Sequence, residues 1–150
     1  MDELRELYQA TILDHNRKPR NFRVLEGPAL HADGHNPLCG DQLTVYLDLE
    51  GERVKDVAFQ GTGCAISVAS ASLMTDFVQG KSLEEVERKF RDFHEMVTSE
   101  PGSPVQTPDI GKLAVFSGVR EFPMRVKCAT LAWHTLRAAL HQDGSTARTE

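Results

Sequence analysis

Residues 61–78 read GTGCAISVASASLMTDFV, and this stretch predicts the strand-to-helix turn around which the fold is organised. Gly61 and Gly63 allow backbone conformations that other residues avoid, so we expect the chain to turn sharply from a strand into a helix here. The run of Ser and Ala from Ala65 to Val78 predicts a helix whose small side chains can pack close against a sheet. Cys64 falls at the N-terminus of this helix, where the dipole and the unpaired N–H groups stabilise a thiolate.

The residues before this turn predict strands. Apolar and more polar residues alternate over 43–49, and Val54, Val57 and Phe59 continue the β pattern after a turn at 50–52. This arrangement is typical of a β-hairpin. Residues 20–40 are rich in Pro, Gly, Asn and Asp and predict a loop with at most one short strand.

Further helices are predicted by apolar spacing and by one capping signal. Ser82 and Glu85 form a capping box, after which a helix begins. Apolar residues at helical spacing predict the others: 3–15, 112–117 and a last helix over 128–140. The fold class is therefore α+β, with a small antiparallel sheet of about three strands packed against several helices.

Length and composition predict one globular domain. The chain has 150 residues, 40% hydrophobic and 26% charged, which excludes a disordered or collagen-like protein. We expect a single domain over 1–141, with an extra segment at about 91–109 and a frayed tail over 142–150. The apolar runs are too short for a membrane span, and the acidic N-terminus lacks the profile of a signal peptide, so we expect a cytoplasmic protein. A net charge of −5 without a long basic block argues against a nucleic-acid partner.

The three cysteines, Cys39, Cys64 and Cys128, are the strongest indication of function. An odd number excludes a fully paired disulfide framework. They could be small buried apolar residues, as free cysteines often are. However, each is predicted to lie at a junction between elements, which favours a metal site assembled by the fold.

The residues beside two of these cysteines support this interpretation. In an extended chain Cys39 and Asp41 would point to the same side, so that a thiolate and a carboxylate could share one centre. Cys128 is expected to begin the last helix, and the positive charges of Arg125 and Lys127 are expected to lower the pKa of its thiol.

Three motifs in this order carry a family resemblance: Cys39-Gly40-Asp41, Gly61-Thr62-Gly63-Cys64-Ala65 and Arg125-Val126-Lys127-Cys128. Over nearly the whole chain they resemble the IscU / NifU N-terminal family of iron–sulfur cluster assembly proteins. The resemblance implies an α+β fold and a ligand set of Cys39, Asp41, Cys64 and Cys128. It also implies two kinds of partner, a pyridoxal-phosphate-dependent cysteine desulfurase that supplies sulfur and downstream iron–sulfur assembly or acceptor proteins.

Two departures from the IscU pattern point to the SufU branch, which binds zinc and relays persulfide sulfur. Lys127 stands where IscU scaffolds carry a His, and residues 91–109 are additional. Three thiolates and one carboxylate also suit a tetrahedral Zn²⁺ site. We therefore expect a zinc-dependent sulfur relay with Cys39 as the catalytic, sulfur-accepting residue, because Cys39 lies on a loop; Cys128 is the second choice.

Other functions remain open on the sequence alone. Thiolates also hold iron–sulfur clusters, so a scaffold that assembles a [2Fe–2S] or [4Fe–4S] cluster is the first alternative, and it would not be an enzyme. A structural zinc module that serves only in protein interactions is the second.

His35 could approach the site, although a loop histidine is more often solvated, and His134 is expected to be structural. The Pro-rich segment 91–109 is expected to lie on the surface and to serve partner recognition.

Overall fold

A computed structural model describes residues 2–26, 30–37, 39–101, 103, 111–141 and 147–148, with only the backbone described for 2–8 and 147–148. The elements follow one another in an order typical of an α+β domain. They are α1 (Asp2–Arg17), β1 (Leu30–Asn36), β2 (Asp41–Glu50), β3 (Arg53–Thr62), α2 (Ala65–Val78), α3 (Leu83–Thr98), the 3-10 helix η1 (Gly111–Glu121), α4 (Pro123–His141) and β4 (Ala147–Arg148).

The sheet has the strand order β3-β2-β1-β4. β1, β2 and β3 form an antiparallel meander, and the two-residue β4 pairs in parallel with Gly34 and His35 of β1. The predicted α+β class and its three-stranded antiparallel sheet are therefore confirmed. Residues 147–148 lie in the part that we expected to be a frayed tail, and the rest of that tail lies outside the described residues.

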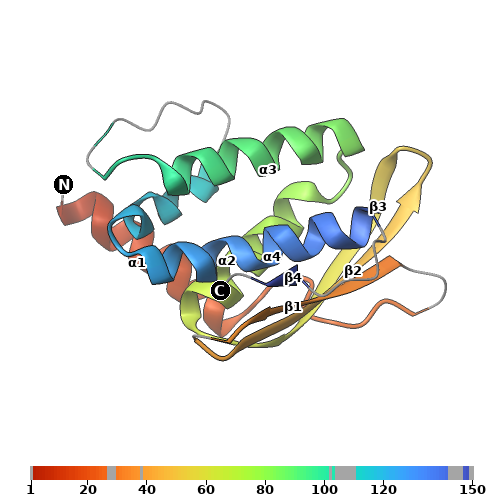
Figure 1. Ribbon diagram of the computed structural model, residues 1–150, viewed down its shortest axis with the longest axis horizontal. Helices are drawn as coiled ribbons and strands as arrows, with labels where there is room; N and C mark the ends of the chain where they lie inside the picture. Colours follow the sequence, from red (N-terminus) through yellow and green to blue (C-terminus); the bar gives the residue numbers. More distant parts are fainter. Residues whose placement is uncertain are drawn as a thin grey trace.

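One face of the sheet is covered by α2 and α4, and the other is open (Figure 1). Along β2 the residues that face the helices, Leu43, Val45 and Leu47, are buried, whereas the alternate residues are partly or fully exposed. β1 and α4 approach each other closely, because a Cβ atom on Gly34 would lie 1.9 Å from Thr135 Oγ1. This close contact fixes the position of α4 over the end of the sheet.

The helix after the glycine turn is as predicted. α2 spans Ala65–Val78 with Cys64 as its N-cap residue, and most of its Ser and Ala side chains are buried against α1, α4 and β3. The capping box is also confirmed, since Ser82 Oγ accepts the Glu85 N–H at 3.2 Å. Hydrogen bonds from the side chain and the backbone N–H of Ser82 lower the pKa of Glu85 in return.

The expected start of the last helix is wrong. α4 begins at Pro123 rather than at Cys128, so Cys128 lies in the second turn of the helix and not at an element junction. Proline is favoured at the first position of a helix, because its missing N–H would be unpaired there in any case.

The extra segment at 91–109 is also not wholly a surface segment. Its first eight residues complete α3, and Phe93, Met96 and Val97 are buried in the core. These side chains continue the apolar face that Val86 begins, whereas the three prolines of the segment all follow residue 100. The expectation of a surface segment is therefore wrong for 91–98, and residues 104–110 lie outside the described residues.

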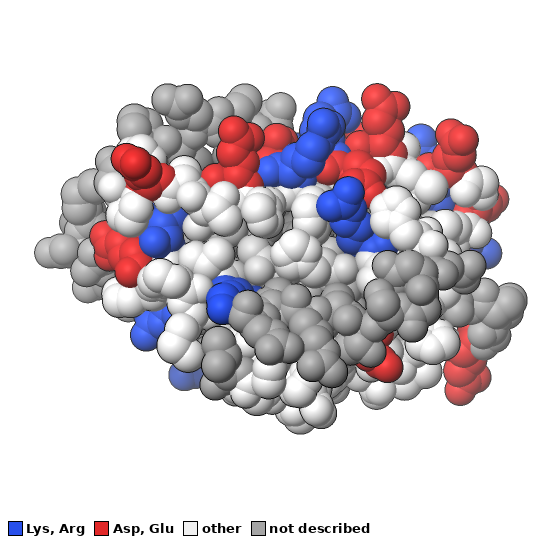
Figure 2. All heavy atoms as spheres, viewed as in Figure 1, with Lys and Arg blue, Asp and Glu red and all other residues white. Residues whose placement is uncertain are grey.

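The face of the molecule drawn in Figure 2 carries charges of both signs. Over the face drawn in Figure 2, acidic and basic side chains are interspersed along α3, and the described residues there form no uniformly positive surface. No helix in the described part of the chain is both long and apolar enough to cross a bilayer.

The packing of α3 can be tested by shortening one buried ring. Phe93 is completely buried and stacks on Trp133, with ring centroids 5.1 Å apart. We expect Phe93→Ala to lower the free energy of unfolding by about 3–5 kcal/mol in denaturant titrations, because it leaves a cavity in the core. Arg91→Ala, on the exposed side of the same helix, should leave it nearly unchanged. Equal effects of the two substitutions would contradict this account of the segment.

Candidate metal centre

Three ligand side chains meet at one end of the sheet, where the β1–β2 turn and α4 come together. Cys39, Asp41 and Cys128 each offer a ligand atom, and these atoms all lie within 4.8 Å of one another. The sulfur atoms of Cys39 and Cys128 are 3.3 Å apart. The fold thus brings together residues from widely separated parts of the sequence.

Asp41 is the most deeply buried member of this group. It is the first residue of β2 and is completely buried. Its Oδ1 accepts the backbone N–H of Cys64 at 2.9 Å, which connects β2 to the start of α2. A Cβ atom on Gly63 would lie 2.7 Å from the same oxygen, so the glycine leaves the space that the carboxylate occupies. Gly63 is therefore needed for two reasons: it allows the turn, and it leaves room for the Asp41 carboxylate.

Cys64 occupies the position predicted for it. As the N-cap residue of α2 it is half-buried, and its Sγ accepts the Ser67 N–H at 3.5 Å. Its side chain is also a hydrogen-bond partner of Cys128. Cys64 therefore lies beside Cys128, on the side of α2, but its Sγ is not among the ligand atoms that lie within 4.8 Å of one another.

Cys128 is the buried member of the group. Burial is the main cause that raises the pKa of its thiol, followed by hydrogen bonds with Cys39, Asp41 and Cys64. The expected lowering of this pKa by Arg125 and Lys127 is therefore wrong, because burial outweighs their charge. Cys128 therefore contacts each of the other three predicted ligands.

Cys39 differs from the other three ligands because it is exposed. It precedes Gly40, whose φ of +72° places the backbone in the left-handed region. The expectation of an extended Cys39-Gly40-Asp41 segment is therefore wrong. Cys39 and Asp41 reach the same centre through a turn, which only a residue without a Cβ adopts readily.

The donor set suits a thiophilic metal ion. Three sulfur atoms and one carboxylate give the four ligands that zinc takes in tetrahedral sites. A buried group of thiolates and a carboxylate is also costly to maintain unless a cation compensates their charge. The residues present therefore fit zinc, and the thiolates fit an iron–sulfur cluster as well.

Comparisons with known proteins agree with this geometry. The sequence profile of the NifU-like N-terminal domain matches residues 7–142. The chain belongs to the NifU-like N-terminal domain family. This confirms the resemblance to the IscU / NifU N-terminal family of iron–sulfur cluster assembly proteins.

Individual relatives of the family carry two different names. The chain is 37% identical over 145 residues to the "iron-sulfur cluster assembly scaffold protein IscU" of Streptococcus pyogenes, covering 97% of this chain and 89% of that one. It is also 37% identical over 137 residues to the "zinc-dependent sulfurtransferase SufU" of Bacillus subtilis, covering 91% of each. A crystal structure named FiSufU, from Fervidobacterium islandicum, aligns with a TM-score of 0.80 at 33% identity, covering 87% of this chain and 93% of that one.

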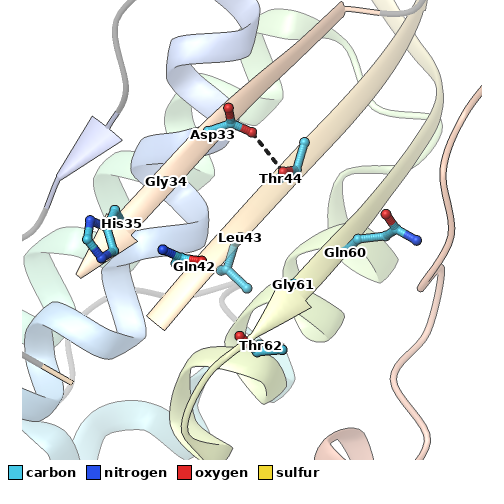
Figure 3. Close-up of a pocket in the computed structure, with 9 residues that line it drawn as sticks. All are labelled: Asp33, Gly34, His35, Gln42, Leu43, Thr44, Gln60, Gly61 and Thr62. Atoms are coloured by element: carbon cyan, nitrogen blue, oxygen red, sulfur yellow. Dashed lines mark hydrogen bonds between the residues drawn. The ribbon is translucent and has the colours of Figure 1, made fainter. Parts of the chain in front are cut away.

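The histidines considered from the sequence lie away from the group of ligands. His35 points to the open face of the sheet, where it lines a polar hollow of about 520 Å³ together with Asp33, Gln42 and Thr62 (Figure 3). His134 packs against Phe90 and His94 between α4 and α3, and burial lowers the pKa of its imidazole. Neither histidine belongs to the metal-ligating group found among the described residues.

One residue at the site was missed in the sequence. Asn36 is completely buried, and its Nδ2 lies 3.4 Å from Asp41 Oδ2 and 3.5 Å from Cys128 Sγ. A polar residue at the end of a strand is not unusual, so the sequence contains no clear signal for this role. Only the register of β1 against β2, which pairs Asn36 with Asp41, makes the contact evident.

Gly63 offers a direct test of the site in this family member. We expect Gly63→Ala to weaken zinc binding by about tenfold in competition with a chromogenic chelator, because the new methyl group displaces the Asp41 carboxylate. Gly118→Ala is the matched control, since a Cβ atom there meets nothing within 4 Å. Unchanged zinc affinity in Gly63→Ala would show that the position of this carboxylate does not matter for binding.

Proposed function

We propose that this chain accepts persulfide sulfur from a cysteine desulfurase at a zinc site formed by Cys39, Asp41, Cys64 and Cys128. The observation that carries the proposal is the difference in exposure among the thiols. Cys39 is exposed on a turn, whereas Cys128 is buried and Cys64 is half-buried at a helix cap. One ligand is therefore accessible to a partner while the others are held by the fold.

The relatives support a role in sulfur transfer. The Bacillus subtilis relative is named a zinc-dependent sulfurtransferase. Lys127 stands directly before Cys128, where IscU scaffolds carry a His, and this favours the SufU branch. A relay of this kind needs reduced thiols, which persist in a reducing compartment, and we therefore place the protein in the cytoplasm.

When bound, zinc supplies a positive centre that keeps the ligating thiols deprotonated at neutral pH. The Asp41 carboxylate is held by the Cys64 N–H, which lies outside the exposed turn. Cys64 is fixed by the first turn of α2, so moving it would disturb the packing of that helix. The ligand that can leave with least cost is Cys39.

The sulfur transfer itself is a thiol–persulfide exchange. The Cys39 thiolate attacks the terminal sulfur of the persulfide on the desulfurase, and a new S–S bond forms on Cys39. The S–S bond of the donor persulfide breaks, and its electron pair leaves with the cysteine thiolate of the desulfurase. The step is balanced without an external oxidant or reductant. Exposure of Cys39 provides the access that this attack requires.

A scaffold for cluster assembly is the second candidate function. The Streptococcus pyogenes relative is named an iron–sulfur cluster assembly scaffold, and three converging thiols would serve a cluster as well as zinc. Purification without oxygen of a coloured, iron-containing protein would favour this candidate. The exposed Cys39 argues against the third possibility, a purely structural zinc module, because structural zinc sites are closed.

The assignment of Cys39 can be tested by mass spectrometry after reaction with a cysteine desulfurase and cysteine. We expect an added mass of about 32 Da, one sulfur atom, on the peptide that contains Cys39. Cys39→Ala should abolish sulfur acceptance while some zinc is retained, whereas Asp41→Ala should mainly loosen zinc and slow the transfer. A persulfide found on Cys64 or Cys128 and absent from Cys39 would overturn the assignment.

A further inference from the structure

Asn36 lies between two ligand residues at the end of β1. It pairs with Asp41 in the β1–β2 register, and its side chain is completely buried. The Nδ2 atom is 3.4 Å from Asp41 Oδ2 and 3.5 Å from Cys128 Sγ. Because an amide NH₂ group has two hydrogens, this one group can donate to the carboxylate and to the sulfur together.

The orientation of the amide follows from the chemistry of its neighbours. The reverse orientation would place the amide oxygen against a carboxylate oxygen and a sulfur atom, which would repel it. In the orientation present, Asn36 Oδ1 is buried and has no hydrogen-bond partner among the described residues. An unpaired buried carbonyl oxygen costs stability. Asn36 is therefore a poor residue for folding alone, and the contacts that its NH₂ group makes are with ligands.

The ligands are not held equally. Asp41 is held at both oxygens, by the Cys64 N–H and by Asn36. Cys128 is held by Asn36 from β1 and by its own place in α4. Within the described part of the chain, Cys39 Sγ accepts a hydrogen bond from Cys128 Sγ at 3.3 Å, and Cys128 is itself a ligand. The backbone N–H of Cys39 also donates to the Asn36 carbonyl at 3.3 Å, so the difference lies in the side chains. The Asn36 amide group holds those of Asp41 and Cys128 and makes no such contact with Cys39 Sγ.

We propose that Asn36 is a positioning residue that keeps Asp41 and Cys128 on the metal while Cys39 leaves it to accept sulfur. This inference rests on the proposed relay and specifies how the metal is retained during transfer. Outer-shell partners of this kind orient ligands and commonly change metal affinity when they are removed. Asn36 would matter most when Cys39 is away, since three ligands then hold the ion.

The test combines Asn36→Leu with Cys39→Ala. Leucine has nearly the shape of asparagine but donates no hydrogen bond. Zinc affinity is measured by competition with a chromogenic chelator in the unchanged protein, in each single variant and in the double variant. The melting temperature of each metal-free protein is measured in parallel. His35→Ala is the matched control, because His35 is the neighbouring residue and its side chain lies on the open face of the sheet.

We expect Asn36→Leu to weaken zinc binding about 10-fold when Cys39 is present and about 100-fold in the Cys39→Ala background. We expect Asn36→Leu to change the metal-free melting temperature by the same amount with and without Cys39, because it removes the unpaired Oδ1 but also the hydrogen bond to Asp41 Oδ2. His35→Ala should change neither zinc affinity nor its dependence on Cys39. Asn36→Thr, which restores one donor, should recover part of the affinity.

The same measurements can overturn the inference. An equal loss of zinc affinity in both backgrounds would show that Asn36 is no more important when Cys39 is away, and no loss in either would show that it does not hold the ligands. If Asn36→Leu does not fold, the zinc affinities of Asn36→Ala and Asn36→Thr are compared instead, again with and without Cys39. Failure of the unchanged protein to bind zinc would overturn the relay and this inference together, whereas tight zinc binding without an effect of residue 36 would overturn this inference alone.

Discussion

The carboxylate of Asp41 is shielded from water, and two segments of the chain, the β3–α2 turn and the end of β1, are arranged to compensate for its burial. The β3–α2 turn supplies the Cys64 N–H, the end of β1 supplies the Asn36 amide, and Gly63 leaves the necessary space. A buried carboxylate is destabilising by several kcal/mol unless it is hydrogen-bonded or paired with a cation. The position of the thiols follows from this constraint, because Cys39 and Cys64 lie on the two turns that meet at Asp41.

The site combines one exposed ligand, Cys39, with ligands that are held by helices. Cys64 is fixed by a helix cap and Cys128 by the second turn of α4, which packs closely on β1 at Gly34. Cys39 lies on a turn that depends on the left-handed conformation of Gly40. A metal centre with this arrangement can lose one ligand to a reaction and retain the others, which is the property that a sulfur relay requires.

The elements with a strong local signal were predictable from the sequence. Gly61, Gly63 and the Ser/Ala run indicated the turn and the bounds of α2, and the motifs around the three cysteines indicated the family. Features that depend on tertiary contacts were not predictable. The contact of Asn36 with Cys128, for example, joins residues 92 positions apart. Burial, which reverses the expected pKa shift of Cys128, is likewise a property of the fold. The start of α4 at Pro123 is a different case, since proline at the first helical position is a local signal.

The central claim is that three thiolates and one carboxylate of this chain hold zinc. X-ray absorption at the zinc edge, on protein purified without oxygen, tests it most directly. The account predicts one zinc ion per chain with three sulfur neighbours at about 2.3 Å and one oxygen neighbour at about 2.0–2.2 Å. Absence of zinc with iron and bridging sulfide in its place, or a zinc ion surrounded only by oxygen and nitrogen, would contradict the account.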